Sequence, residues 1–257
     1  MNQLFPTGLV CLHCGEPRRM DGTAVLCEKC RRELEDMRVP AHSCKRCLSR
    51  LEKDGTCKFC KGDGLGDIAC AYAPYRYQAV ARSLCHQLKF NDTDDALFDM
   101  CRDMADAWPD RAYDVMVPVP LHRLRQRVRG CNQAMKLCEG VSRLTGVQVL
   151  DALVRTRHTR PQAALQREAD RKNNVENAFA MQAGCDVKGK RVLLVDDIRT
   201  SGSTARACAR VLLQHGARQV ALLTYGVVWH YKGKKDGSLA GKNGLAAWLR
   251  GRRKTEK

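Results

Sequence analysis

Residues 192–204 read VLLVDDIRTSGST, an apolar run that ends in two adjacent aspartates and continues into a turn of small residues. Such a run is typical of a central parallel strand. Asp196 and Asp197 then lie at its carboxyl end, where open α/β sheets bind ligands. The turn offers backbone N–H groups, hydroxyls and the N-terminus of a helix beginning near Ser203, all of which favour an anion. Carboxylates repel phosphate but suit sugar hydroxyls or magnesium, so the stretch predicts a site for a phosphorylated ribose.

Two other interpretations of the acidic pair remain open. Phosphoacceptor domains also place two carboxylates after a strand, where they form a magnesium pocket. Alternatively, the pair simply caps a loop. The hydroxyl-Gly-hydroxyl run over residues 200–204 favours the phosphosugar site over both.

The chain on both sides of this stretch alternates between strand-like and helix-like segments. Strands are expected at 69–75, 113–121, 191–197 and 219–228, and amphipathic helices at 78–90, 94–108, 132–146 and 203–216. This alternation predicts an α/β fold in which helices flank a parallel sheet. A glycine-rich stretch, KGDGLGDI at 61–68, predicts the boundary between this body and a smaller N-terminal module.

The N-terminal module is rich in cysteine. Eight of the 15 cysteines form four CxxC pairs: Cys11/Cys14, Cys27/Cys30, Cys44/Cys47 and Cys57/Cys60. Two CxxC turns can close one Cys₄ zinc site, so the four pairs predict two structural zinc ions in a double zinc ribbon. Redox or disulfide chemistry is the competing interpretation, but a redox CxxC occurs once, ahead of a helix, and reducing compartments disfavour structural disulfides. The spacing leaves open whether the pairs combine sequentially or interleave.

Charge is distributed unevenly along the chain. The formal net charge is +17, which favours an anionic partner. Residues 120–175 carry 12 basic against 4 acidic residues, and residues 226–257 carry 9 against 2, whereas residues 1–69 carry 12 against 10. Two zinc ions on eight thiolates would make the ribbon slightly acidic, which favours a structural or protein-docking role there. The start of the chain does not resemble a secretory signal, and no apolar run is long enough to cross a bilayer, so a cytoplasmic protein without a transmembrane segment is expected.

Four stretches together resemble one known family. VLLVDDIRTSGST resembles the phosphoribosyl-pyrophosphate signature of type I phosphoribosyltransferases. The paired CxxC ribbons, VPVPLHRLRQRVRGCNQA at 117–134 and RTRHTRPQAALQREADRKNNVENAF at 155–179 resemble the ComF/GntX branch, in the family's order. The resemblance covers residues 11 to about 228. It implies a double zinc ribbon at 9–62, a phosphoribosyltransferase-like domain at 70–228 and, beyond the pattern, a basic tail at 229–257.

The resemblance also implies roles for individual residues. Asp196 and Asp197 would hold the ribose hydroxyls, and either could stabilise the developing positive charge on the ring. The 5′-phosphate would bind Thr200, Ser201, Gly202, Ser203 and Thr204. The pyrophosphate loop would include Leu121, His122 and Arg123, with Arg129 and Asn132 close by. Residues 155–175 would form a hood loop over the site.

The implied function is a phosphoribosyltransferase-like protein that binds phosphoribosyl pyrophosphate with magnesium and transfers phosphoribose to a nitrogen acceptor. The ComF family is associated with natural DNA uptake beside a helicase-like competence protein. The alternative function is therefore a non-catalytic ligand sensor or scaffold for single-stranded DNA and that partner. The sequence does not identify the acceptor.

Overall fold

The computed structural model describes residues 10–17, 25–51, 55–90, 94–108, 112–121, 130–156 and 178–229. His122, Arg123, Arg129, most of the predicted hood loop and the basic tail from residue 230 lie outside these ranges. The expected strands and helices of the α/β body are all present. The main sheet contains β1 (Ala71–Tyr72), β2 (Tyr75–Arg76), β3 (Val115–Pro118), β4 (Gln148–Val149), β7 (Arg191–Arg199) and β8 (Gln219–Val227).

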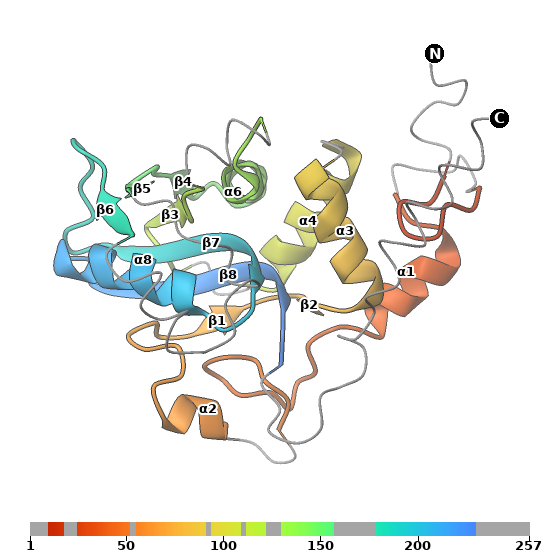
Figure 1. The fold of residues 1–257 in the computed structure, drawn as a ribbon, viewed down its shortest axis with the longest axis horizontal. Coiled ribbons are helices and arrows are strands. Elements are labelled where there is room, and N and C mark those ends of the chain that lie inside the picture. The colour runs from red at the N-terminus through yellow and green to blue at the C-terminus, as the bar shows by residue number, and fades with distance from the viewer. Residues whose placement is uncertain are drawn as a thin grey trace.

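The sheet is parallel throughout, as the sequence predicts. Its order is β1-β8-β7-β3-β4, with β2 also paired to β8. β7 and β8 are the longest strands, with nine residues each, and they lie at the centre of the sheet (Figure 1). Their apolar runs are buried because helices cover both faces.

Alternate residues of β7 belong to two different cores. Leu193 and Val195 pack with helices α3 (Ala79–Phe90), α4 (Asp94–Asp106) and α6 (Gln133–Thr145). Val192 and Leu194 pack on the opposite face with helix α8 (Ser203–Gln214). The period of two along a strand divides the apolar residues between the two layers. Figure 1 shows α3, α4 and α6 on one side of the sheet and α8 on the other.

A two-stranded antiparallel hairpin lies beside the main sheet. It consists of β5 (Leu153–Arg155) and β6 (Phe179–Met181), two strands that the sequence did not predict. The predicted hood loop of residues 155–175 therefore starts inside a strand, at Arg155, and the chain between the two strands leaves the described residues after 156.

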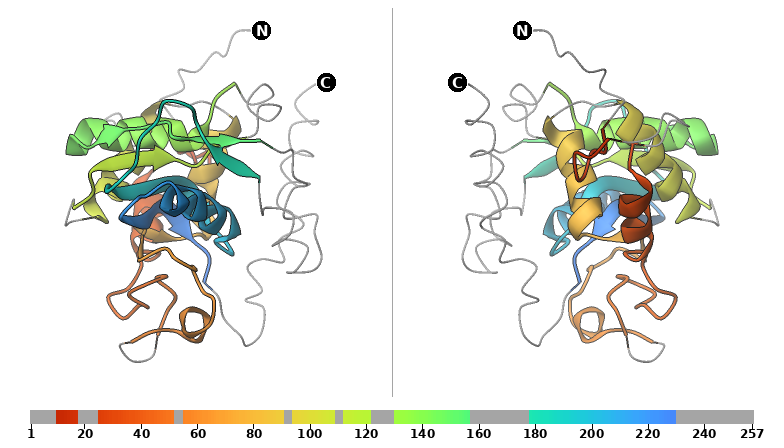
Figure 2. Two further views of the ribbon diagram at one scale, coloured as in Figure 1. Left: turned by 90° about the vertical axis from the view of Figure 1, so that its left-hand side faces the viewer. Right: turned by 90° about the vertical axis from the view of Figure 1, so that its right-hand side faces the viewer.

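The cysteine-rich segment contains two short helices, α1 (Glu28–Glu35) and α2 (Lys58–Lys61). The two helices lie far apart, with α1 beside α3 and α2 on the side of the sheet that carries α8 (Figures 1 and 2). The glycine-rich stretch at 61–68 is packed rather than open, because Leu65 and Ile68 are completely buried. The two cysteine-rich halves thus share the cores of the α/β body.

None of the described helices could cross a membrane. The longest of them, α4 and α6, have 13 residues each, whereas a span takes about 20.

Candidate functional site

The candidate site lies at the carboxyl ends of β3 and β7. These strands are neighbours, with Pro118 paired to Val195. From β3 the chain passes through α6 to β4 on one side, and from β7 it passes through α8 to β8 on the other. The two connections leave in opposite directions, which opens a crevice at the strand ends where α/β proteins bind ligands.

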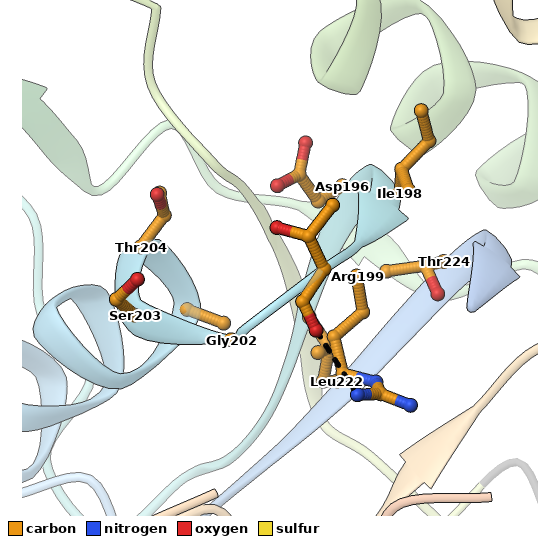
Figure 3. A pocket seen from close by; sticks show the side chains of 10 residues that line it. Asp196, Ile198, Arg199, Gly202, Ser203, Thr204, Leu222 and Thr224 are labelled. Atoms are coloured by element: carbon orange, nitrogen blue, oxygen red, sulfur yellow. Dashed lines mark hydrogen bonds between the residues drawn. The ribbon is translucent and has the colours of Figure 1, made fainter. Parts of the chain in front are cut away.

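A small pocket lies beside this edge of the sheet, between the end of β7, the turn that follows it, the start of α8 and the neighbouring strand β8 (Figure 3). Five predicted site residues line it together: Asp196, Thr200, Gly202, Ser203 and Thr204. The lining also includes residues to which the sequence assigned no role, namely Ile198, Arg199, Ala205, Leu222 and Thr224. Of the predicted residues in the described part of the chain, Asp197, Ser201 and Leu121 do not line this pocket.

The turn between β7 and α8 has the geometry of an anion site. Gly202 is the N-cap of α8 and adopts φ 77°, a left-handed conformation that favours glycine. The N-terminus of α8 begins beside it at Ser203 and carries partial positive charge. Hydroxyls lie beside it, with Ser201 Oγ and Ser203 Oγ 2.7 Å apart. A Cβ on Gly202 would lie 3.0 Å from Cδ2 of Leu65, so the turn also rests closely on the glycine-rich stretch.

The two aspartates are not equivalent in the structure. Asp196 lines the pocket, and its Oδ1 accepts a hydrogen bond of 2.9 Å from the backbone N–H of Asp197. This bond fixes the Asp196 carboxylate beside the turn at residues 200–204. Asp197 is the next residue of β7 and lies beside the pocket.

The predicted pyrophosphate loop begins at the same edge of the sheet. The backbone N–H of Val119 donates to the carbonyl of Val195 at 2.8 Å, which holds the end of β3 against β7 just before Leu121. On the far side of the loop, Asn132 caps α6. Its Oδ1 accepts from the N–H of Ala134 at 3.2 Å, and its Nδ2 donates to the carbonyl of Val119 at 3.1 Å. Both ends of the loop are therefore anchored beside Asp196.

The eight cysteines form two groups of four, and the pairs combine sequentially. The sulfur atoms within each group lie within 4.8 Å of one another, and the groups are Cys11, Cys14, Cys27, Cys30 (the first cluster) and Cys44, Cys47, Cys57, Cys60 (the second cluster). An interleaved pairing is thus wrong. Zn–S bonds of about 2.3 Å place tetrahedral sulfurs about 3.8 Å apart, close to the 3.8 Å between Cys14 and Cys27 and the 3.3 Å between Cys47 and Cys57.

The chemistry of both clusters fits a zinc ion. Burial raises the pKa of the Cys11 and Cys44 thiols, but surrounding backbone N–H groups outweigh it and lower each pKa to about 7. These two thiols are therefore prepared to lose a proton to a metal. For Cys60, burial raises the pKa of the thiol most, and the hydrogen bond and charge of the neighbouring Cys47 raise it further. Both clusters could bind zinc.

Arg199 lines the pocket, and the sequence analysis assigned it no role. It stands within the quoted stretch, is only 2% exposed and has the second cluster as a neighbour. A charged residue at the end of an apolar strand was the signal available, because a buried arginine requires partners. In Figure 3 its guanidinium and the Asp196 carboxylate point to opposite sides of the strand.

Comparison with known proteins agrees with this architecture. Residues 142–236 match the family model described as Phosphoribosyl transferase domain. The chain is similar to DNA utilization protein YhgH of Escherichia coli K12, with 32% identity over 82% of this chain and 87% of the relative. It is also similar to Competence protein ComFC of Bacillus subtilis, with 25% identity over 81% and 90%. Among solved structures, glutamine phosphoribosylpyrophosphate amidotransferase from B. subtilis aligns at 20% identity over 54% of this chain and 30% of that one, with a TM-score of 0.37, which is too low to carry an argument.

The fold, the turn after β7 and the family model together define a phosphoribosyltransferase-type α/β domain, here combined with two four-cysteine clusters. Its extended similarity to YhgH, across most of both chains, identifies the family more narrowly. The chain belongs to the ComF family.

Proposed function

We propose that this protein binds phosphoribosyl pyrophosphate with magnesium at the pocket after β7 and transfers the phosphoribosyl group to a nitrogen acceptor. One observation carries the proposal: a carboxylate and a hydroxyl-rich helix N-terminus line the same small pocket, with Asp196 on one side and Ser203 and Thr204 on the other. A phosphorylated sugar needs both kinds of group at once.

The chain's residues would act mainly by orientation and charge. The turn at 200–204 would hold the 5′-phosphate, and Asp196 with Asp197 would hold the ribose hydroxyls. The acceptor nitrogen attacks the anomeric carbon as the bond to the pyrophosphate oxygen breaks. The leaving pyrophosphate keeps that electron pair, and the acceptor N–H proton passes to solvent. Arg123 and Arg129 would neutralise the leaving group, while Asp196 or Asp197 stabilises the ring as it becomes positive.

Calorimetry with phosphoribosyl pyrophosphate tests the binding site directly. We expect binding that requires magnesium and that falls by about tenfold or more in D196N and D197N, because each substitution removes a charged hydrogen-bond partner. D186N is the matched control, since Asp186 is an exposed aspartate whose Oδ1 accepts from the N–H of Lys188. Wild-type affinity in both site variants would show that the site is elsewhere. Release of pyrophosphate with candidate nitrogen acceptors separates an enzyme from a ligand sensor.

We also propose two bound zinc ions per chain, held by the first and second clusters. Metal analysis of protein purified without a metal-affinity tag should find two zinc ions. One ion, none, or an iron–sulfur absorption band would contradict this assignment.

A second candidate function is a scaffold for single-stranded DNA and a helicase-like competence protein. Two observations favour it: relatives are named for DNA utilization and competence, and 15 of the 17 net positive charges lie in residues 120–175 and 226–257. Binding through these basic segments would fall steeply with salt, and few aromatic residues would give little sequence preference.

Fluorescence anisotropy of a labelled single strand across a salt series tests this candidate. Removal of residues 232–257 should weaken binding and flatten the salt dependence, yet leave phosphoribosyl pyrophosphate binding unchanged. Unchanged DNA binding after removal of 232–257 would show that the tail is not the DNA-binding segment. Pyrophosphate release without DNA binding would favour a metabolic transferase.

A further inference from the structure

A single buried side chain, Arg199, joins the phosphate turn to the second cysteine cluster. Its Nη2 donates a hydrogen bond of 2.8 Å to the backbone carbonyl of Cys47. Its Nη1 donates one of 3.1 Å to the carbonyl of Thr200, the first residue of the turn. One planar guanidinium therefore bridges a residue of the cluster and a residue of the pocket, although Arg199 and Cys47 are 152 positions apart in the sequence.

The charge of Arg199 requires a negative partner. The side chain is 2% exposed, and its Nε is buried with no hydrogen-bond acceptor in the described part of the chain. No carboxylate among the described residues forms an ion pair with it. A zinc ion on four thiolates carries a formal charge of −2, since each thiolate contributes −1. An isolated buried guanidinium is strongly unfavourable, and the second cluster is the negative group beside it.

The electrostatic environment of Arg199 agrees with this pairing. Burial lowers the pKa of its guanidinium, and the sulfur atoms of Cys47, Cys60, Cys57 and Cys44 act in the opposite direction. They are therefore the neighbours that favour the charged form of the buried side chain.

Other contacts fix the same two segments together. The side chain of Leu65, five residues after the last ligand of the second cluster, is completely buried and lies against Gly202. In α8, Arg206 Nη1 donates a 2.5 Å hydrogen bond to the carbonyl of Gly64 and lies 3.6 Å from Asp63. A change in the cluster would therefore reach the turn through packed groups.

We propose that Arg199 is a positioning residue that uses the negative charge of the metal-loaded second cluster to hold the phosphate turn, so that metal retention and phosphate binding strengthen each other. The half that concerns phosphate rests on the function proposed above. Because linkage is reciprocal, phosphoribosyl pyrophosphate at the turn should slow metal loss from the second cluster. The first cluster lies on the other face of the sheet and should not respond.

Zinc release provides the test. Full-length protein is mixed with a colorimetric zinc chelator, with and without magnesium and phosphoribosyl pyrophosphate, and the release of each ion is followed. In R199M we expect one of the two ions to leave about tenfold faster or more, because a charge-assisted hydrogen bond and a counter-charge are both lost. The other ion, which the first cluster holds, is an internal control. The ligand should slow release of the responding ion in the wild type and not in R199M.

Two further variants separate charge from geometry and from general damage. R191M is the control, because Arg191 lies at the opposite end of β7 and pairs with Asp114 at 3.2 Å; zinc release should stay within about twofold of wild type. R199K keeps the charge without the planar pair of donors. It should restore most of the zinc retention while the affinity for phosphoribosyl pyrophosphate stays about fivefold or more below wild type.

The outcomes distinguish this proposal from the proposed function. Wild-type zinc release in R199M, or the same acceleration in R191M, would overturn the role of Arg199. If the wild type does not bind phosphoribosyl pyrophosphate, the proposed function fails, while the release rates without ligand still decide whether Arg199 is the counter-charge. If R199M does not fold, R199K decides: accelerated loss of both ions would contradict the proposal.

Discussion

The first cysteine cluster packs beside α3, and the second packs beneath the phosphate turn. At the first, His13 Nδ1 lies 2.8 Å from Ser83 Oγ, and Gln87 donates to the carbonyl of Leu12 at 3.2 Å. Cys14 is exposed there, whereas all four cysteines of the second cluster are buried. The same CxxC spacing thus produces a partly exposed cluster on one face of the sheet and a fully buried cluster on the other.

This difference shows that a local metal motif does not fix its own role. The first cluster secures α1 against helices α3 and α4, at a distance from the pocket. The second is continuous with the residues that support Gly202 and Arg199. We therefore expect disruption of the second cluster to weaken ligand binding, whereas disruption of the first cluster should have little effect on ligand binding.

The largest expected effect comes from removing one ligand from each cluster. Cys27 and Cys57 are matched, since each is the N-cap of the short helix that carries the last ligand. C27S and C57S should each lose about one zinc ion per chain. C57S should also weaken phosphoribosyl pyrophosphate binding by about tenfold or more, because metal binding contributes directly to folding, whereas C27S should change it by less than about threefold. Metal analysis and calorimetry measure both quantities.

Equal losses of ligand affinity in C27S and C57S would contradict the comparison. They would mean that the two clusters unfold as one unit, so that the two clusters are separate in space but do not unfold independently.

A smaller effect is expected at the contact between the turn and the glycine-rich stretch. G202A forces alanine into a left-handed conformation and brings Cβ to 3.0 Å from Leu65, so the free energy of unfolding should fall by about 1–3 kcal/mol. G146A is the matched control, with φ 76° and open space around the position, and should cost about 1 kcal/mol. Guanidinium unfolding and calorimetry should show reduced ligand binding in G202A alone.

The variant L65A sharpens this prediction. If contact with Leu65 causes the extra cost, G202A should be less destabilising in an L65A background than in the wild type, as a double-mutant cycle reports. Equal costs of G202A and G146A would show that only backbone strain matters and that the turn does not rest on Leu65.

The smallest effect concerns the side of the first cluster. Asp103 in α4 is half-buried near Tyr75 and Arg38, and its burial raises the pKa of the carboxyl from 3.8 to about 6. The folded state therefore binds this proton more tightly than the unfolded state. Stability from this group is present below pH 3.8 and is lost as pH rises towards 6 and slightly beyond. D103N removes the titration and should gain about 1 kcal/mol relative to wild type between pH 5 and pH 7.5.

Chemical unfolding of wild type and D103N at the two pH values measures this gain. The affinity for phosphoribosyl pyrophosphate should not change, because Asp103 lies on the α3 and α4 face, away from the pocket. A relative stability that does not depend on pH would show that Asp103 titrates normally in the folded protein.

Much of the fold was predictable because its signals are local. The apolar run before Asp196 predicted β7, and the helical periodicity after Ser203 predicted α8. A strand that is buried on both faces is apolar throughout, whereas a helix that is buried on one face is apolar at every third or fourth residue. The β5–β6 hairpin was not predicted, because its three-residue strands are too short to show alternation. Thr224 was not predicted as a site residue, because it lies beside Asp196 only through the pairing of β7 with β8.

The sequence by itself determined the parallel α/β class, the eight candidate zinc ligands and the acidic pair followed by a turn of small residues, because each depends on residues a few positions apart. Tertiary structure alone decided that the cysteine pairs combine sequentially, that the two clusters lie on opposite faces of the sheet and that Arg199 connects one of them to the pocket. Those contacts join residues as far apart as Cys47 and Arg199. Only the folded chain brings such residues together, because spacing along a sequence carries no information about which distant surfaces pack.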